Sequence, residues 1–185
     1  MQISTVKTVF ITLFAAGIVA FASACAAIYA GVYDVAASTP DNELVAWALH
    51  TTSDRAIAVR LGDIRTPAGF DKPELIKAGA KLYGDNCVVC HSGPGLLPSP
   101  AAKGMNPAPP DLFREGREAA SEETFWFIKN GVKMSGMPSF GKTYADPEIW
   151  SVVAFLKIAP GMSPQAFTDY TGIDPAAVGM KKAGN

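Results

Sequence analysis

A short cluster of cysteine and histidine residues, Cys87-Val88-Val89-Cys90-His91, carries the clearest chemistry in this 185-residue sequence. Two thiols three positions apart can each add across one vinyl group of a haem, and the adjacent imidazole then lies under the porphyrin face, where it can bind iron. The pattern therefore predicts one covalent haem c, attached through Cys87 and Cys90, with His91 as an axial ligand of the iron.

Three other uses of this cluster suit the chain less well. A thioredoxin-like redox pair expects a preceding strand in a βαβ unit, and the sequence contains no alternating strand pattern of useful length. A zinc site needs about four nitrogen or sulfur ligands, but the other cysteine and histidine are Cys25 and His50. A disulfide between two cysteines this close together is rarer still. Covalent haem is the favoured interpretation.

The second axial position decides what such a haem can do. The candidate ligands elsewhere in the chain are Met105, Met134, Met137 and His50. Met137 is favoured because it stands between a glycine and a proline, in a loop stiff enough to hold a thioether over iron. Met134 is the second choice, and either methionine could instead fill a gap in the core. A haem with histidine and methionine ligands has no free iron position, so we expect an electron carrier with no small-molecule substrate, not an enzyme.

Residues 9–32 are apolar or small apart from Thr12 and Ser23. As a helix they would be about 36 Å long, enough to cross a hydrocarbon core of about 30 Å. Lys7 precedes the stretch and Asp34 follows it, so the positive-inside rule places the N-terminus in the cytoplasm. We expect a single-pass anchor in a bacterial inner membrane, with the rest of the chain in the periplasm.

Two alternatives for this segment stay open. The apolar stretch could be a signal peptide cleaved after Ala22-Ser23-Ala24, although it continues past that point. Cleavage could also leave Cys25 as a lipidated residue, although Ala22 stands where a large aliphatic residue is usual. Both alternatives still carry the rest of the chain across the membrane.

Helical patterns follow the anchor, and no strand pattern does. They cover residues 41–61, 73–84, 121–130 and 146–158, and Thr39 is the expected N-cap of the first. Six prolines between Ser92 and Pro110 exclude a continuous helix there, so this stretch is expected to be a loop. We predict an all-α chain with an anchor at 1–33, a helical linker segment at 34–70, a haem domain at 71–160 and a tail at 161–185.

The charge balance excludes one class of partner. Lys and Arg together number 16 against 17 Asp and Glu, which gives a net charge of −1. No basic cluster is long enough to hold a phosphate backbone, so no nucleic-acid partner is expected. The hydrophobic fraction of 49% also excludes a disordered chain.

Three segments in order, YGDNCVVCHSGPG, IKNGVKMSGMPSFG and DPEIWSVVAFLK, resemble the small monohaem class I c-type cytochromes in their membrane-anchored bacterial form. The resemblance covers residues 73–160. It implies an all-α globule around one haem c, in which the first and last helices cross at a small-residue contact. The contact would join residues of the first helix to residues of the last, namely Gly79 and Tyr83 to Trp150, Val153 and Ala154. The resemblance also implies that a proline carbonyl, of Pro94 or Pro98, accepts the Nδ1–H of His91.

The surroundings of the haem and its partners follow from the same sites. Besides the ligands, the residues expected around the haem are Pro94, Pro98, Trp126, Met134, Phe140 and Tyr144. Lys129, Lys133 and Lys142 bracket the Met137 loop and either steer an acidic partner or form an ordinary solvated face. The expected function is to carry single electrons between an extracytoplasmic dehydrogenase or quinol-oxidising complex and a terminal oxidase or soluble carrier of a respiratory chain. The alternatives are a haem subunit of a larger membrane oxidoreductase, and a haem enzyme or gas sensor whose methionine ligand leaves readily.

Overall fold

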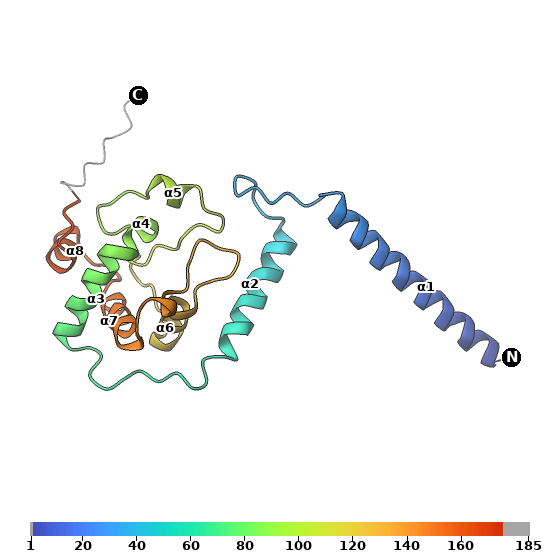
Figure 1. Cartoon of the computed structure of the whole chain (residues 1–185), viewed down its shortest axis with the longest axis horizontal. Helices are drawn as coiled ribbons and strands as arrows, with labels where there is room; N and C mark the ends of the chain where they lie inside the picture. Colours follow the sequence, from blue (N-terminus) through green and yellow to red (C-terminus); the bar gives the residue numbers. More distant parts are fainter. Residues whose placement is uncertain (1, 176–185) are drawn as a thin grey trace, which may run out of the picture. The chain divides into compact units, whose positions relative to one another are not determined.

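A computed structural model describes residues 2–175 of the chain (Figure 1). Its internal contacts divide the chain into two units, Met1–Thr39 and Pro40–Asn185. All regular structure within the described residues is helical, which confirms the predicted all-α class. Helix α2 and the connection to residue 70 therefore belong to the second unit, and the contacts do not separate the chain near residue 70.

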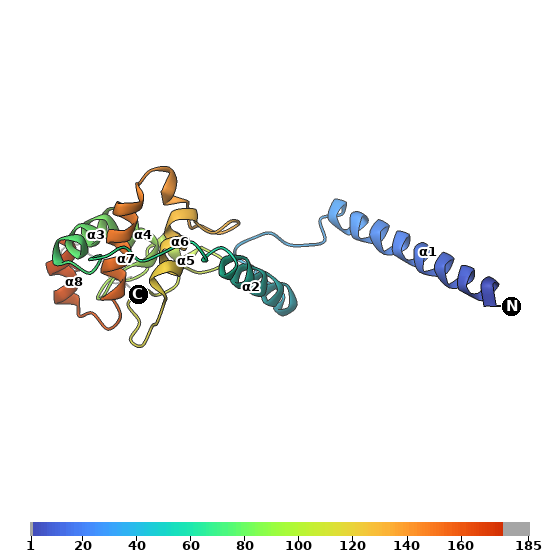
Figure 2. The same cartoon turned by 90° about the horizontal axis from the view of Figure 1, so that it is seen from below.

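The first unit contains one long helix, α1 (Gln2–Tyr29), drawn in blue in Figures 1 and 2, and a short non-helical segment after it. Its stretch Thr5–Tyr29 is long and apolar enough to cross a membrane, and none of the most apolar part is buried against the rest of the protein. Apolar side chains left in this way have no partner in water, whereas a hydrocarbon core would solvate them. The predicted anchor therefore has the length and composition of a membrane span.

Helix α2 (Glu43–Ala58) is shorter at both ends than expected. Its N-cap is Asn42, whose side-chain oxygen accepts the N–H of Leu44 at 2.9 Å. The predicted N-cap, Thr39, belongs instead to a turn upstream, where its hydroxyl donates to Asp34 Oδ2 at 2.8 Å. The hydrogen bond from the N–H of Ala36, and after it the bond from Thr39, lower the pKa of Asp34, because both stabilise its ionised form. The helix is therefore capped three residues later than predicted, by Asn42.

The core of the second unit is the crossing of α3 (Pro73–Asn86) and α7 (Asp146–Lys157). A Cβ atom on Gly79 would lie 1.8 Å from the carbonyl oxygen of Ser151, so only glycine lets the two backbones approach this closely. The ring of Tyr83 meets that of Phe155 one turn further along. The expected helix pair is therefore present, with its closest contact at the backbone of Ser151.

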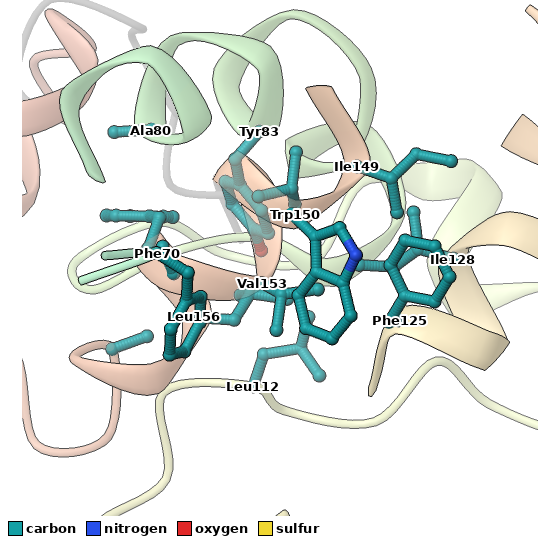
Figure 3. Close-up of a cluster of buried hydrophobic side chains, with 14 of the residues drawn as sticks. Phe70, Ala80, Tyr83, Leu112, Phe125, Ile128, Ile149, Trp150, Val153 and Leu156 are labelled. Atoms are coloured by element: carbon teal, nitrogen blue, oxygen red, sulfur yellow. The ribbon is translucent and has the colours of Figure 1, made fainter. Parts of the chain in front are cut away.

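Helix α6 (Ser121–Asn130) covers the other side of α7. Figure 3 shows the ring of Phe125 against the indole of Trp150; the ring centroids are 4.4 Å apart and the planes 15° from parallel. Phe70 meets the same indole edge to face at 5.9 Å. These aromatic contacts hold α6 in place, and the loop that carries Met137 begins where α6 ends.

The compact unit continues past residue 160, where the haem domain was expected to end. Helix α8 (Pro164–Thr171) packs on α3, and its Phe167 is fully buried. The Phe167 ring meets those of Tyr83 and Phe113 edge to face. Three short helices complete the described part of the unit: α4 (Val88–His91), α5 (Pro100–Lys103) and the 3-10 helix η1 (Phe140–Lys142).

Candidate haem site

The cysteines and histidine of the cluster lie on one helical turn. Cys87 ends α3 and begins α4, and its carbonyl accepts the N–H of Cys90 at 3.1 Å and that of His91 at 2.9 Å. Residues at positions i, i+3 and i+4 of a helix share one face. The two sulfurs and the imidazole therefore belong to the same side of this turn, and all three residues are half-buried.

The imidazole of His91 is oriented by a backbone carbonyl. Its Nδ1 lies 3.0 Å from the oxygen of Pro110, to which the Nδ1–H donates. This bond leaves Nε2 as the atom with a free lone pair, the arrangement that a metal-binding histidine needs. Burial lowers the pKa of His91, because it disfavours the charged form of the ring. The acceptor is a proline carbonyl, as the resemblance implied, but it belongs to Pro110 and not to Pro94 or Pro98.

The loop between His91 and Pro110 is ordered by specific hydrogen bonds. The hydroxyl of the buried Tyr83 donates to the carbonyl of Ser92 at 2.9 Å, and the hydroxyl of Ser99 donates to the carbonyl of Val89 at 2.6 Å. The loop therefore returns to the turn that carries the cysteines before it reaches Pro110. Pro94 is half-buried and Pro98 is exposed along this path.

Burial also acts on the first cysteine, since it raises the pKa of Cys87 to about 12. The same residue borders a small apolar cavity between α3, α6, η1 and α7, which Phe140 and Tyr144 also line. The hydroxyl of Tyr144 donates to Asn86 Oδ1 at 3.0 Å, immediately before Cys87 in the chain. Two of the residues expected around the haem, Phe140 and Tyr144, therefore lie beside Cys87.

The loop that carries Met137 is fixed at both ends. Gly131 ends α6 with φ of +67°, and a Cβ there would lie 2.7 Å from the carbonyl oxygen of Met137. The N–H of Val132 donates to that same oxygen at 3.1 Å, and the N–H of Met137 donates to Ser135 Oγ at 3.1 Å. Met137 itself is half-buried and packs against the core.

The other expected residues lie in different surroundings. Met134 is 93% exposed at the tip of the same loop, with φ of +63°. His50 is exposed on α2, and Trp126 is half-buried on α6, edge to face with Phe127. Lys129 forms an ion pair with Asp146 at 2.7 Å, so this lysine is already engaged within the domain.

Two residues of the site were not predicted from the sequence. Pro110 acts through its backbone, and every residue has a carbonyl, so residue type alone could not mark it. Asn86 directly precedes Cys87, and a polar residue at that point was the available signal. The zinc alternative finds no support, because the described residues contain no group of three or more His, Cys, Asp or Glu that could hold a metal.

The donor set suits a covalent haem. Two thiols on one helical turn can bind the vinyl groups of a haem, an imidazole with its Nε2 free can bind the iron, and a half-buried thioether on a fixed loop can supply the other axial ligand. An all-helical domain built around such groups is typical of the monohaem class I c-type cytochromes, and this domain binds one haem c.

Comparison with known proteins gives the same class. Residues 74–156 match the family described as cytochrome c oxidase, cbb3-type, subunit III. Cytochrome c6 from Picosynechococcus sp. is 26% identical over 109 residues, which cover 55% of this chain and 91% of that protein. No solved structure gave a significant match to the chain. Electron transport through haem is thus the general role of the domain.

Proposed function

We propose that the chain is a membrane-tethered carrier of single electrons, with Cys87 and Cys90 holding the haem and His91 and Met137 as its axial ligands. The observation that carries the proposal is the fixed loop around Met137, which belongs to a different segment of the chain from the oriented imidazole of His91. When bound, haem c supplies a reversible one-electron couple. The protein's own part is to orient His91 through Pro110, hold Met137 in place and exclude water with the aromatic residues around Cys87.

The choice of Met137 over the other candidates rests on burial. A ligand has to be withdrawn from water and held, and Met134 is 93% exposed. His50 is also exposed, and it belongs to α2, which contains neither the CxxCH turn nor the Met137 loop. Met137 is half-buried, with both its N–H and its carbonyl bonded within the loop. With both axial positions filled, the iron has no vacancy for a substrate, which favours electron transfer over an enzyme or gas sensor.

The proposed location is the inner membrane, with the haem domain in the periplasm. The span in α1, with Lys7 on one side and Asp34 on the other, supports this orientation by the positive-inside rule. The partners we propose are a membrane dehydrogenase or quinol-oxidising complex as donor and a terminal oxidase or soluble carrier as acceptor. Confinement to the membrane raises the concentration of the carrier near such partners.

A second candidate is a fixed haem subunit of a larger membrane oxidoreductase. The family match favours it, because that family is described as a subunit of a cbb3-type oxidase. Native electrophoresis of membranes in mild detergent, stained for haem, distinguishes the two. A haem band at high mass supports the subunit, and a band near the mass of the chain alone supports the carrier.

Substitution of the proposed ligand tests the site. Met137→Ala should abolish the weak far-red charge-transfer band of methionine bound to ferric haem and lower the reduction potential, because the thioether favours the ferrous state. Met134→Ala, in the same loop, should leave both unchanged. Absorption spectra and potentiometric titration measure the two effects. The reverse pattern would show that Met134 is the ligand.

A further inference from the structure

The loop that follows the haem-binding turn is held near that turn at two points. Ser99 Oγ donates to the carbonyl of Val89, between the two cysteines, at 2.6 Å. Further along, the carbonyl of Pro110 accepts the Nδ1–H of His91 at 3.0 Å. Between these points, α5 packs on α4 and buries Ala102. The segment from 99 to 110 is therefore part of the histidine side of the site.

Met105 extends from this segment to the other side of the site. Its N–H donates to the carbonyl of Ala102 at 3.3 Å, which fixes its backbone to α5. Its side chain lies against Gly136, the residue immediately before Met137. A Cβ atom on Gly136 would lie 2.9 Å from Met105 Sδ and 3.1 Å from Met105 Cε. The half-buried thioether thus occupies the space that a larger residue at 136 would need.

This contact joins two loops that local hydrogen bonds hold separately. The Met137 loop is tied to itself through Val132 and Ser135. Met105 adds a contact between this loop and the segment fixed to the CxxCH turn. A methionine suits such a place, because its flexible thioether fills an irregular gap.

We propose that Met105 is a positioning residue for the haem iron: by packing on Gly136 it holds the Met137 loop closed, so that the methionine ligand stays on the metal. The proposal rests on the proposed function, in which Met137 is the ligand. Without the Met105 side chain, the loop has room to move away from α5, and a larger fraction of molecules has Met137 off the iron. An external ligand binds more tightly in proportion to that fraction.

The test uses the full-length haem protein and carbon monoxide as the probe of the ferrous iron. Met105→Ala should keep the covalent haem and the far-red band of the ferric protein, while its affinity for carbon monoxide rises roughly tenfold. Met134→Ala is the matched control, since it removes an exposed methionine from the same loop and should leave the affinity unchanged. Met105→Leu keeps most of the volume and should restore the low affinity.

Gly136→Ala tests the contact from its other side. The added methyl should displace the end of the Met105 side chain and raise the affinity for carbon monoxide in the same direction as Met105→Ala. In the double variant the methyl enters the space that Met105 leaves, so the two effects should be less than additive. Gly136→Ala alone also tests the proposal if Met105→Ala fails to fold.

The outcomes separate this proposal from the assignment of the ligand. If the carbon monoxide affinity is unchanged in Met105→Ala and Gly136→Ala, and the far-red band is lost only in Met137→Ala, the role of Met105 is overturned. The assignment of Met137 as the ligand then stands. Loss of the far-red band in Met105→Ala, with its retention in Met137→Ala, would make Met105 the ligand and overturn both. Additive effects in the double variant would overturn the contact as the cause.

Discussion

At the scale of single residues, Tyr83 links the hydrophobic core to the haem-binding turn. Its ring is fully buried among Phe113, Phe155 and Phe167. Its hydroxyl donates to the carbonyl of Ser92, directly after His91, at 2.9 Å. Burial raises the pKa of Tyr83 well above its ordinary value of 10.0, and this cause persists when both cysteine sulfurs are uncharged thioethers. The folded protein therefore keeps this phenol protonated.

Tyr83→Phe should have an effect on stability that depends on pH. Near pH 8 the variant should lose about 1–2 kcal/mol, because the carbonyl of Ser92 loses its buried donor. Above pH 10 the unfolded wild type ionises this tyrosine and the folded protein does not, so the unfolded state binds fewer protons. The free energy of unfolding of the wild type then falls with pH, by up to about 1.4 kcal/mol per pH unit from this group. Phenylalanine does not titrate, so the gap between the two proteins should narrow.

Urea unfolding at a series of pH values from 8 to about 11 measures this gap. Tyr170→Phe is the control, because Tyr170 is 36% exposed. That control should leave the free energy of unfolding near pH 8 unchanged. A gap that stays constant for Tyr83→Phe would show that Tyr83 ionises equally well in the folded state.

At the scale of helices, the crossing of α3 and α7 depends on the absence of one side chain. Gly79→Ala would place a Cβ 1.8 Å from the carbonyl oxygen of Ser151, a backbone atom that can move only with its helix. The helices would have to separate, and we expect a loss of about 3 kcal/mol or more in the free energy of unfolding. Urea unfolding of the haem protein measures it.

Gly84→Ala is the matched control on the same helix. Its Cβ would lie 3.1 Å from Ile173 Cδ1, the end of a flexible side chain. The variant should range from neutral to about 1 kcal/mol more stable, because alanine is a better helix former than glycine. Equal losses in both variants would mean that local strain from an added methyl group on α3, and not the crossing, explains the result.

The elements with strong local signals were predictable from the sequence. A proline in the first turn gave the starts of α3 and α7, and acidic residues in the first turn gave the start of α6. The ends of α6 and α7 were also predicted to within a residue. The chemistry of the CxxCH cluster was equally local, since its three groups lie on one turn. For Met137, the flanking glycine and proline predicted a loop, and the half-burial that supports its role became visible only in the fold.

Long-range contacts were not predictable in this way. Pro110 reaches His91 across 19 residues through an atom that every residue has. The burial of Phe167 depends on Tyr83 and Phe113, which lie far away in the sequence, so α8 read as part of a tail. Thr39 and Asn42 are both good caps, and the choice between them depends on the turn at Asp34 that engages Thr39.

At the scale of the whole molecule, the chain consists of two units whose compositions suit different surroundings, a membrane and water. The apolar stretch Thr5–Tyr29 has the composition of a membrane span, and the unit from Pro40 onward has its own buried core. Lys133 and Lys142 are exposed beside the Met137 loop, where they can steer an acidic partner in a salt-dependent way. The function we propose requires the first unit only to confine the second near its partners.

Removal of the first unit should therefore change the location of the domain and the rate of electron delivery, but not the haem site. A variant in which a cleavable signal sequence replaces residues 1–39 should yield a periplasmic, water-soluble domain with the far-red band and carbon monoxide affinity of the full chain. Electron delivery to membranes that lack the native protein should be slow at micromolar concentrations of the domain. It should recover near the millimolar effective concentration that a short tether provides. Oxygen uptake by such membranes, titrated with the purified domain, measures this.

No recovery at any concentration would favour a fixed subunit that needs its helix to assemble. A domain that stays on the membrane would mean that a surface of the second unit binds there independently. Leu44 and Trp47 of α2 are among its exposed apolar residues.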